Sequence, residues 1–307
     1  MCRRSSARSG LRHTLVLASL PLALAVAACA PQGDNGTATD AAGGSPSAGS
    51  SSGDAAARCT PDQLPLKNAG RLTVGTDSPA YDPWFVGNDP TNGKGYESAV
   101  AYAVAEQLGF SRDQVTWVKV PFNSSYAPGP KSFDFDINQI SITPARAKVV
   151  DFSDGYYAAA QAVIALDGTA GAKATSLADL RGLRLGAQTG TTSLTAIRDV
   201  ITPEHDPAVF EDTNAAKQAL QNDQVDAILA DLPTAFYISA VEIPHSTIVG
   251  QFQPETGQQE EFGMLFEKGS GLVPCVDAAL ATLKQDGTLD GLEQRWLSDV
   301  VDVPTLQ

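Results

Sequence analysis

The residues best suited to chemistry lie in one short stretch, S-I-T-P-A-R, at positions 141–146. Pro144 suits the first position of a helix and the Thr143 hydroxyl can cap it, so a helix is expected to begin here with Arg146 in its first turn. Free N–H groups at a helix start and a guanidinium fork together match the geometry of a carboxylate. Ser141, Thr143 and Arg146 are therefore candidates for binding a carboxylate. The alternative is a surface arginine that follows a turn.

The segment before this turn predicts a strand that leads the chain to the candidate site. Between positions 133 and 138, phenylalanine or isoleucine alternates with aspartate or asparagine. A period of two is typical of a strand with one buried and one exposed face. Polar residues then gather at Asn138, Gln139 and Ser141, where the strand is expected to end.

Strand and helix patterns alternate along the rest of the chain, which predicts an α/β fold. Residues 59–307 are enough for two modest domains, each with its own core. Strands are expected over 71–76, 115–120, 183–187 and 227–229, and helices over 97–109, 215–221, 233–241 and 273–283.

The stretch S-I-T-P-x-R, followed by V-V-D-F-S-x-x-Y-Y, resembles the core motif of the family 3 solute-binding proteins of amino-acid ABC transporters. Further motifs occur in the order typical of that family, and the resemblance covers about residues 71–297. These motifs are L-T-V-G-T-D at 72–77, G-Y-E at 95–97, L-R-L-G at 183–186, G-T-T at 190–192, V-D-A at 225–227, Asp231, and D-G-T at 286–288.

The resemblance implies a two-lobed α/β fold of the type II periplasmic-binding-protein class, with the lobes joined by two crossing strands. The ligand of such a fold lies between the lobes, at the carboxyl ends of the sheet strands. Lobe 1 is expected to comprise residues 59–158 and 258–307, and lobe 2 residues 159–257. The resemblance further implies a monomer that passes an amino acid to an ABC permease and its ATPase.

The resemblance also implies which residues meet the ligand. One group in lobe 1 corresponds to the pocket for the ligand side chain, and a second to the ligands of its carboxylate and amino groups. Lobe 2 adds donors at a helix start and the Asp231 carboxylate, which accepts from the α-ammonium; plain helix capping is the alternative for these residues. The expected set is Asp77, Tyr81, Trp84 and Phe122, then Asn138, Gln139, Ser141 and Arg146, and in lobe 2 Gly190, Thr191, Thr192 and Asp231.

The sequence departs from the family pattern beside the expected side-chain pocket. Ala99 stands where the family usually has an aspartate, the loop 85–94 is longer than usual, and 126–130 replaces an apolar helix. Asp77, together with Asp82 and Glu97, favours a cationic or amide side chain on the ligand.

Two other functions are open for this fold, namely a dehydratase of cyclohexadienyl or arogenate-type substrates and a surface solute sensor. The single G-x-S-x-G match, G-S-S-S-G at 49–53, lies in the Gly/Ser-rich stretch 29–58, and the chain has no paired serine and histidine and no phosphate loop. We therefore expect a binding protein rather than an enzyme.

The amino terminus predicts export and a lipid anchor. Four arginines precede an apolar run at 15–28, as in a secretory signal. The run ends V-A-A-C, which resembles the bacterial lipobox, so residues 1–28 are expected to be removed and Cys29 to be lipidated; an ordinary cleavage site is the alternative. Residues 29–58 are rich in Gly, Ser and Ala and predict a disordered tether. The protein is thus expected on the outer face of the cytoplasmic membrane.

The net charge and the cysteines of the chain restrict which partners and cofactors are expected. The formal net charge is −14, and loss of the four leader arginines makes it −18, which argues against nucleic acid and anionic lipid headgroups. There is no C-x-x-C pair and no histidine cluster, so we expect neither a metal nor a cofactor. Cys59 and Cys275 remain as a pair and are expected to form a disulfide, because the family packs the segments that carry them on the same lobe.

Overall fold

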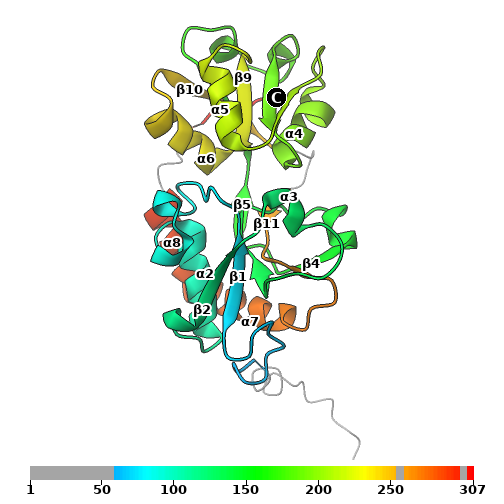
Figure 1. The fold of residues 1–307 in the computed structure, drawn as a ribbon. Coiled ribbons are helices and arrows are strands. Elements are labelled where there is room, and N and C mark those ends of the chain that lie inside the picture. The colour runs from blue at the N-terminus through cyan, green and yellow to red at the C-terminus, as the bar shows by residue number, and fades with distance from the viewer. Residues whose placement is uncertain (1–58, 254–258, 298–302) are drawn as a thin grey trace, which may run out of the picture. The chain divides into compact units, whose positions relative to one another are not determined.

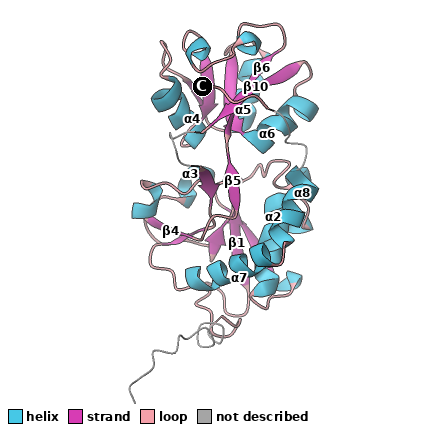
Figure 2. Cartoon of the chain, turned by 180° about the vertical axis from the view of Figure 1, so that it is seen from behind, coloured by secondary structure: helices cyan, strands magenta, loops and turns pink. Residues whose placement is uncertain are grey.

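The computed structural model describes residues 59–253, 259–297 and 303–307. The expected signal peptide, lipidated Cys29 and tether lie outside these residues. The described strands form two five-stranded sheets and one two-stranded sheet, and Figures 1 and 2 show the helices arranged around the larger sheets. None of the helices in the described ranges combines the length and the apolar character that a membrane crossing requires.

The first sheet is mixed and is built around β1, whose five residues are all buried. Strand β1 runs parallel to both β2 and β3, whereas β12 runs antiparallel to β3 and β4. In spatial order its strands are β2 (Val115–Lys119), β1 (Leu72–Thr76), β3 (Phe135–Asp136), β12 (Leu265–Glu267) and β4 (Val150–Phe152).

The second sheet also has five strands and is also mixed. Its strand β7 runs parallel to β8 and β9, and β6 runs antiparallel to β9 and β10. The apolar run of β6 is buried on both faces, since alternate residues belong to cores on opposite sides of the sheet. The order is β10 (Ser246–Phe252), β6 (Gln161–Leu166), β9 (Ala227–Asp231), β7 (Leu185–Gln188) and β8 (Ala208–Phe210).

Two antiparallel strands join the sheets and define the hinge of the molecule. These are β5 (Tyr157–Ala159) and β11 (Glu260–Phe262), and Glu260 pairs with Ala159. The chain passes from β4 through β5 into β6, and returns through β11 into β12 (Figure 1). This arrangement is the expected two-lobed fold with two connecting strands. The exact lobe boundaries remain a prediction.

Helices cover each large sheet. Those beside the first sheet are α2 (Tyr96–Gln107), the single turn α3 (Phe122–Ser125), α7 (Val273–Gln285) and α8 (Thr288–Leu297). Those beside the second are α4 (Thr192–Ala196), α5 (Thr213–Gln221) and α6 (Leu232–Tyr237). Helices α4 and α6 continue into the π-helical segments η7 (Ile197–Ile201) and η8 (Ile238–Glu242).

The carboxyl terminus differs from the expected division into lobes. Residues 258–307 were all expected in lobe 1, but 303–307 lie against the second sheet. The N–H of Gln251 in β10 donates to the carbonyl of Pro304 at 2.8 Å, and Leu306 packs into a core of that sheet. A five-residue tail carries too little pattern to predict such packing.

The two cysteines form the expected disulfide. Cys59 precedes β1 and Cys275 lies in the first turn of α7, and their Cα atoms are 5.4 Å apart. The bond closes a loop with a sequence separation of 216. It fastens the start of the described chain to a carboxyl-terminal helix of the same lobe.

The alternating segment before the candidate site is not a half-exposed strand. Strand β3 consists of Phe135 and Asp136, which are both buried, and the preceding Phe133 and Asp134 are buried as well. Asp134 accepts the backbone N–H groups of Lys67 at 2.7 Å and Thr73 at 2.6 Å, which supports the burial of its carboxylate. Asp136 is fully buried, and burial, followed by repulsion from the Glu97 carboxylate, raises its pKa well above the usual range. The expectation of an exposed polar face was wrong. Backbone N–H groups of distant residues bind Asp134, whereas both carboxylate oxygens of Asp136 are buried without a hydrogen-bond partner among the described residues.

Candidate ligand-binding site

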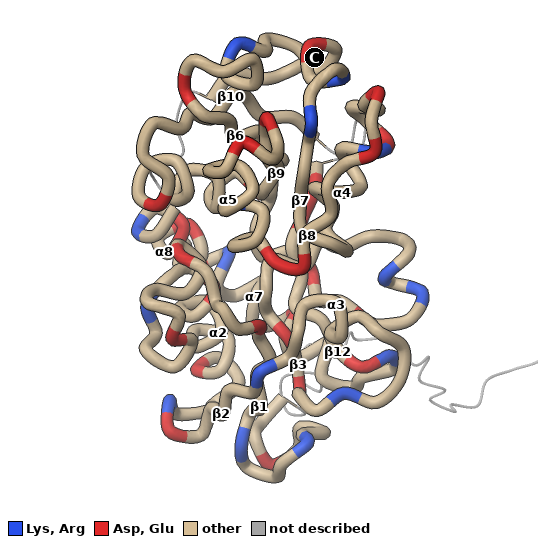
Figure 3. The backbone as a smooth tube through the Cα atoms, turned by 45° about the horizontal axis from the view of Figure 1, so that its top comes forward, with Lys and Arg blue, Asp and Glu red and all other residues tan. Residues whose placement is uncertain are grey.

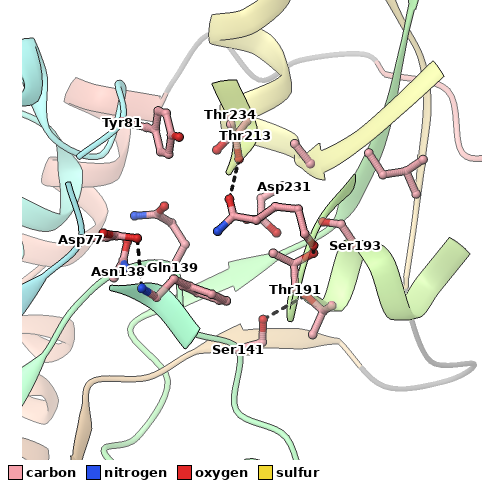
Figure 4. A pocket seen from close by; sticks show the side chains of 15 residues that line it. Asp77, Tyr81, Asn138, Gln139, Ser141, Thr191, Ser193, Thr213, Asp231 and Thr234 are labelled. Carbon is pink, nitrogen blue, oxygen red and sulfur yellow. Dashed lines mark hydrogen bonds between the residues drawn. The ribbon is translucent and has the colours of Figure 1, made fainter. Parts of the chain in front are cut away.

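A cavity of about 610 Å³, counting space open to solvent, lies between the carboxyl ends of strands from both large sheets (Figure 4). It is lined by Asp77, Tyr81, Phe122, Asn138, Gln139 and Ser141 from lobe 1, and by Gln188, Thr191, Thr192, Ser193, Thr213, Leu229, Ala230, Asp231 and Thr234 from lobe 2.

The loops after β1 and β2 form one wall of the cavity. The Asp77 carboxylate accepts the N–H of Ser78 at 2.6 Å and that of Phe122 at 3.0 Å, so it ties the two loops together. The Tyr81 hydroxyl is buried without a hydrogen-bond partner in the described chain, and burial raises its pKa. The side-chain N–H₂ of Asn138 is likewise buried and unpaired among the described residues. These two polar groups are available to a ligand.

Hydroxyl groups from the two lobes meet on a second wall. The Oγ atom of Ser141 and the Oγ1 atom of Thr192 are 3.2 Å apart. Thr191 acts as the cap of α4, since its hydroxyl accepts the N–H of Leu194 at 3.1 Å and donates to the carbonyl of Gln188. Of this pair of threonines, Thr192 is therefore the one whose hydroxyl faces the opposite lobe.

Asp231 stands at the end of β9 and opens α6, but its side chain does not cap that helix. Its Oδ1 accepts from Nε2 of Gln161 at 3.1 Å, and the same Nε2 lies 2.7 Å from Oε2 of Glu260 in the hinge strand β11. Burial, and then the nearby Glu260 carboxylate, raise the pKa of Asp231 well above its usual range. A cation placed beside Asp231 would relieve both effects.

Arg146 lies at the start of a short 3₁₀ turn, η4 (Arg146–Lys148), and not in the first turn of an α-helix as expected. Its guanidinium donates to the Ser141 carbonyl at 2.8 Å and, across the lobes, to the Gly190 carbonyl at 2.9 Å. It also stacks 4.7 Å from the Tyr126 ring centroid. Arg146 does not line the central cavity; it lines a neighbouring cavity whose lining also includes Ser141 and Thr192.

Besides Arg146, two further expected residues lie outside the lining of the central cavity. Trp84 is fully buried in the lobe 1 core, and its indole N–H donates to the Thr234 hydroxyl at 2.8 Å across the lobes. Gly190 contributes its carbonyl, and with φ of 76° and the Asn123 side chain where a Cβ would stand, this position requires glycine. Both residues join the lobes without lining the central cavity.

A model of the family "bacterial extracellular solute-binding proteins, family 3" matches residues 72–299. The chain belongs to this family. Curated relatives of this solute-binding protein include the L-cystine-binding protein TcyJ of Escherichia coli K12, 28% identical over 239 residues that cover 75% of the chain and 84% of the relative. The L-cystine-binding protein TcyA of Bacillus subtilis 168 is 30% identical over 243 residues, which cover 77% and 84%.

Solved structures agree with this assignment. The arginine-, lysine-, histidine-binding protein ArtJ of Geobacillus stearothermophilus matches with a TM-score of 0.64 and 26% identity, over 74% of this chain and 95% of that one. An ancestral arginine-binding protein bound to glutamine matches with a TM-score of 0.63 and 31% identity, over 74% and 97%. The two-lobed fold of this solute-binding protein is therefore that of known amino-acid-binding proteins.

Several residues that line the cavity of this solute-binding protein were not among those expected. Most of them lie near the end of a lobe 2 strand or the start of a helix, and the strand expected at 183–187 was the available signal for Gln188. They are Gln188, Ser193, Thr213, Leu229, Ala230 and Thr234. Within the described ranges, no group of three or more His, Cys, Asp or Glu side chains is arranged to hold a metal ion.

Proposed function

We propose that this solute-binding protein captures a free amino acid outside the cytoplasmic membrane and presents it to an ABC importer. The observation that carries the proposal is the distribution of polar groups in the cavity. The Ser141 and Thr192 hydroxyls, with the Arg146 guanidinium in the adjoining cavity, suit an α-carboxylate. Asp231 suits an α-ammonium, whose charge would offset the repulsion from Glu260.

The side chain of the ligand is proposed to be cationic or polar. The two charged residues that line the described cavity are Asp77 and Asp231, and none of the described lining residues is Lys or Arg. Tyr81 and Asn138 add polar groups that lack partners in the described chain. Relatives named for arginine, cystine and glutamine are consistent with this class of ligand.

We propose that both lobes hold the ligand, so that binding and lobe closure are one event. Ser141 and Arg146 belong to the first lobe and Thr192 and Asp231 to the second, and groups of both lobes already touch. The ligand would stand between a carboxylate receptor and an ammonium receptor, in a site from which closure excludes water. Either charge left without its partner is then strongly unfavourable.

The protein is proposed to work as a monomer anchored through Cys29, with an ABC permease and its ATPase as partners. The acidic chain, in which basic positions are few (Figure 3), disfavours a nucleic-acid partner. Mass spectrometry of the native amino terminus tests the anchor, and a terminus that begins at another residue without lipid would exclude it.

A thermal-shift screen of the purified protein against the twenty L-amino acids, cystine, ornithine and citrulline tests the proposal. A ligand that binds the native state raises the apparent melting temperature, and we expect this from one or a few basic or polar amino acids. Prephenate and arogenate serve as controls for the dehydratase alternative, and we expect no turnover of either. If no amino acid shifts the transition, or if these substrates are consumed, the proposal is wrong.

A further inference from the structure

Gln139 occupies the cavity wall in an unusual backbone conformation. Its φ is 46°, in the left-handed region that a residue with a side chain rarely adopts. The neighbouring residues Asn138 and Ser141 line the same cavity. Something must hold Gln139 in this conformation, and the wall of the cavity depends on it.

The Glu97 carboxylate holds Gln139 at two points. Its Oε1 accepts the backbone N–H of Gln139 at 2.7 Å, and its Oε2 accepts the side-chain amide of the same residue. Glu97 is fully buried in the first turn of α2, where the positive end of the helix dipole favours a carboxylate. A buried carboxylate that accepts from both amides of one residue fixes that residue's backbone and side chain together.

The same carboxylate also reaches the hinge. Oε1 of Glu97 accepts from the hydroxyl of Tyr156, which directly precedes hinge strand β5. The N–H of Tyr156 donates to the Phe262 carbonyl of β11 at 2.9 Å, and its carbonyl accepts from the Tyr96 hydroxyl at 2.8 Å. Glu97 therefore connects the cavity wall with the two strands that join the lobes.

We propose that Glu97 is a positioning residue for ligand binding, which sets the conformation of Gln139 and couples it through Tyr156 to the hinge. This inference rests on the proposed function for its ligand, but the Glu97–Gln139 connection can be tested without one. The competing explanation is that Glu97 merely stabilises the lobe 1 core.

The two explanations predict different effects of pH on the conformation of Gln139. Burial raises the pKa of Glu97 to about 7, although the bonds from Tyr156 and Gln139 oppose this rise. The titratable groups that act on Glu97 or respond to it are the carboxyls of Asp136 and Asp231 and the hydroxyls of Tyr96 and Tyr156. Protonation of Glu97 gives one oxygen a hydrogen and removes an acceptor, so Gln139 should be released as the pH falls through about 7.

The first experiment needs no ligand. The backbone and side-chain amide signals of Gln139 are followed by ¹⁵N NMR between pH 5.5 and 8.5 in the wild type, Glu97→Gln and the matched control Glu106→Gln, whose glutamate is exposed in the same helix. We expect both signals to titrate with one midpoint near 7 in the wild type and the control, and this titration to vanish in Glu97→Gln. If the two Gln139 signals change neither with pH nor with the Glu97→Gln substitution, the proposal is wrong.

The second experiment asks whether Glu97 acts through Gln139. Affinities for L-arginine, L-glutamine and L-cystine are measured at pH 8 by calorimetry in the wild type, Glu97→Gln, Gln139→Gly and the double variant. Glycine adopts a positive φ without strain, so the double variant no longer needs the Glu97 carboxylate. We expect Glu97→Gln to weaken binding about tenfold in the wild-type background and less than about threefold in the Gln139→Gly background.

An equal loss in both backgrounds would assign Glu97 to the core alone and overturn the proposal. If none of the three probes binds the wild type, the proposed ligand class is wrong. The NMR titration then still decides whether Glu97 positions Gln139.

Discussion

At the scale of single residues, the account depends on two opposite charges in two adjoining cavities. Asp231 lines the central cavity at the end of β9, and Arg146 lines the neighbouring cavity, whose lining also includes Ser141 and Thr192. Arg146 makes two directed bonds to carbonyl groups, one of them to Gly190 in the other lobe. Its guanidinium thus serves lobe contact as well as the proposed carboxylate.

The variant Arg146→Lys tests whether ligand binding requires the planar guanidinium group of Arg146. A lysine ammonium keeps the charge but cannot reproduce the two directed bonds, and its buried charge loses the Tyr126 stacking geometry. We expect a loss of at least about thirtyfold in affinity, about 2 kcal/mol, for the amino acid found by the thermal screen. Calorimetry measures it, with the exposed Arg198→Lys as control. Equal affinity of both variants would contradict a directed role.

The raised pKa of Asp231 predicts the direction in which pH changes the ligand affinity. Its raised pKa means that lowering the pH adds a proton to the ligand-free carboxyl, and a bound ammonium must displace that proton. We therefore expect ligand binding to release protons, and affinity to fall, as the pH is lowered from 8 to 6. Calorimetry in buffers of different ionisation enthalpy measures the released protons. Asp231→Asn should abolish the share of the release that belongs to Asp231, and an unchanged release would contradict the assignment.

At the scale of elements, the sequence predicted the scaffold better than the site. The strands β1, β2, β7 and β9 and the helices α2, α5 and α7 lie close to the ranges expected from the sequence. The helix expected after Thr143 was not found, because the chain forms only a 3₁₀ turn before entering β4. Local capping signals cannot reveal such competition from a neighbouring sheet.

The local sequence also contained no pattern that predicts the contacts between the lobes. Trp84 lies 150 positions from Thr234, to which it donates, and Gln161 lies 99 positions from Glu260. Both contacts arise because the hinge strands bring the two sheets together. The family resemblance, rather than any periodicity, placed Asp77, Ser141, Thr192 and the other expected residues on the cavity.

The disulfide predicts an effect on stability without an effect on binding. Closing a loop with a sequence separation of 216 contributes up to about 5 kcal/mol in the chain-entropy model. The double variant Cys59→Ser/Cys275→Ser should therefore unfold at lower urea concentration. Its ligand affinity should stay within about threefold of wild type, since neither cysteine lines the cavity. A tenfold loss of affinity would show that the disulfide supports the site.

At the scale of the whole molecule, the two lobes are joined by the strands β5 and β11 and by polar contacts around the cavity. These contacts are few and hydrogen-bonded, unlike the apolar cores within each lobe. A ligand that bonds to both lobes can therefore add a large share of the free energy that holds them together. This is the physical reason to expect binding and closure as one event.

The most direct test of the central claim varies the ligand and leaves the protein unchanged. Calorimetry on the purified protein compares the amino acid from the screen with its methyl ester, which lacks the carboxylate charge, and its N-acetyl derivative, which lacks the ammonium charge. We predict that each derivative binds at least about a hundredfold more weakly, about 2.7 kcal/mol, because each leaves Arg146 or Asp231 without its partner. Binding of either derivative within about threefold of the free amino acid would contradict the account.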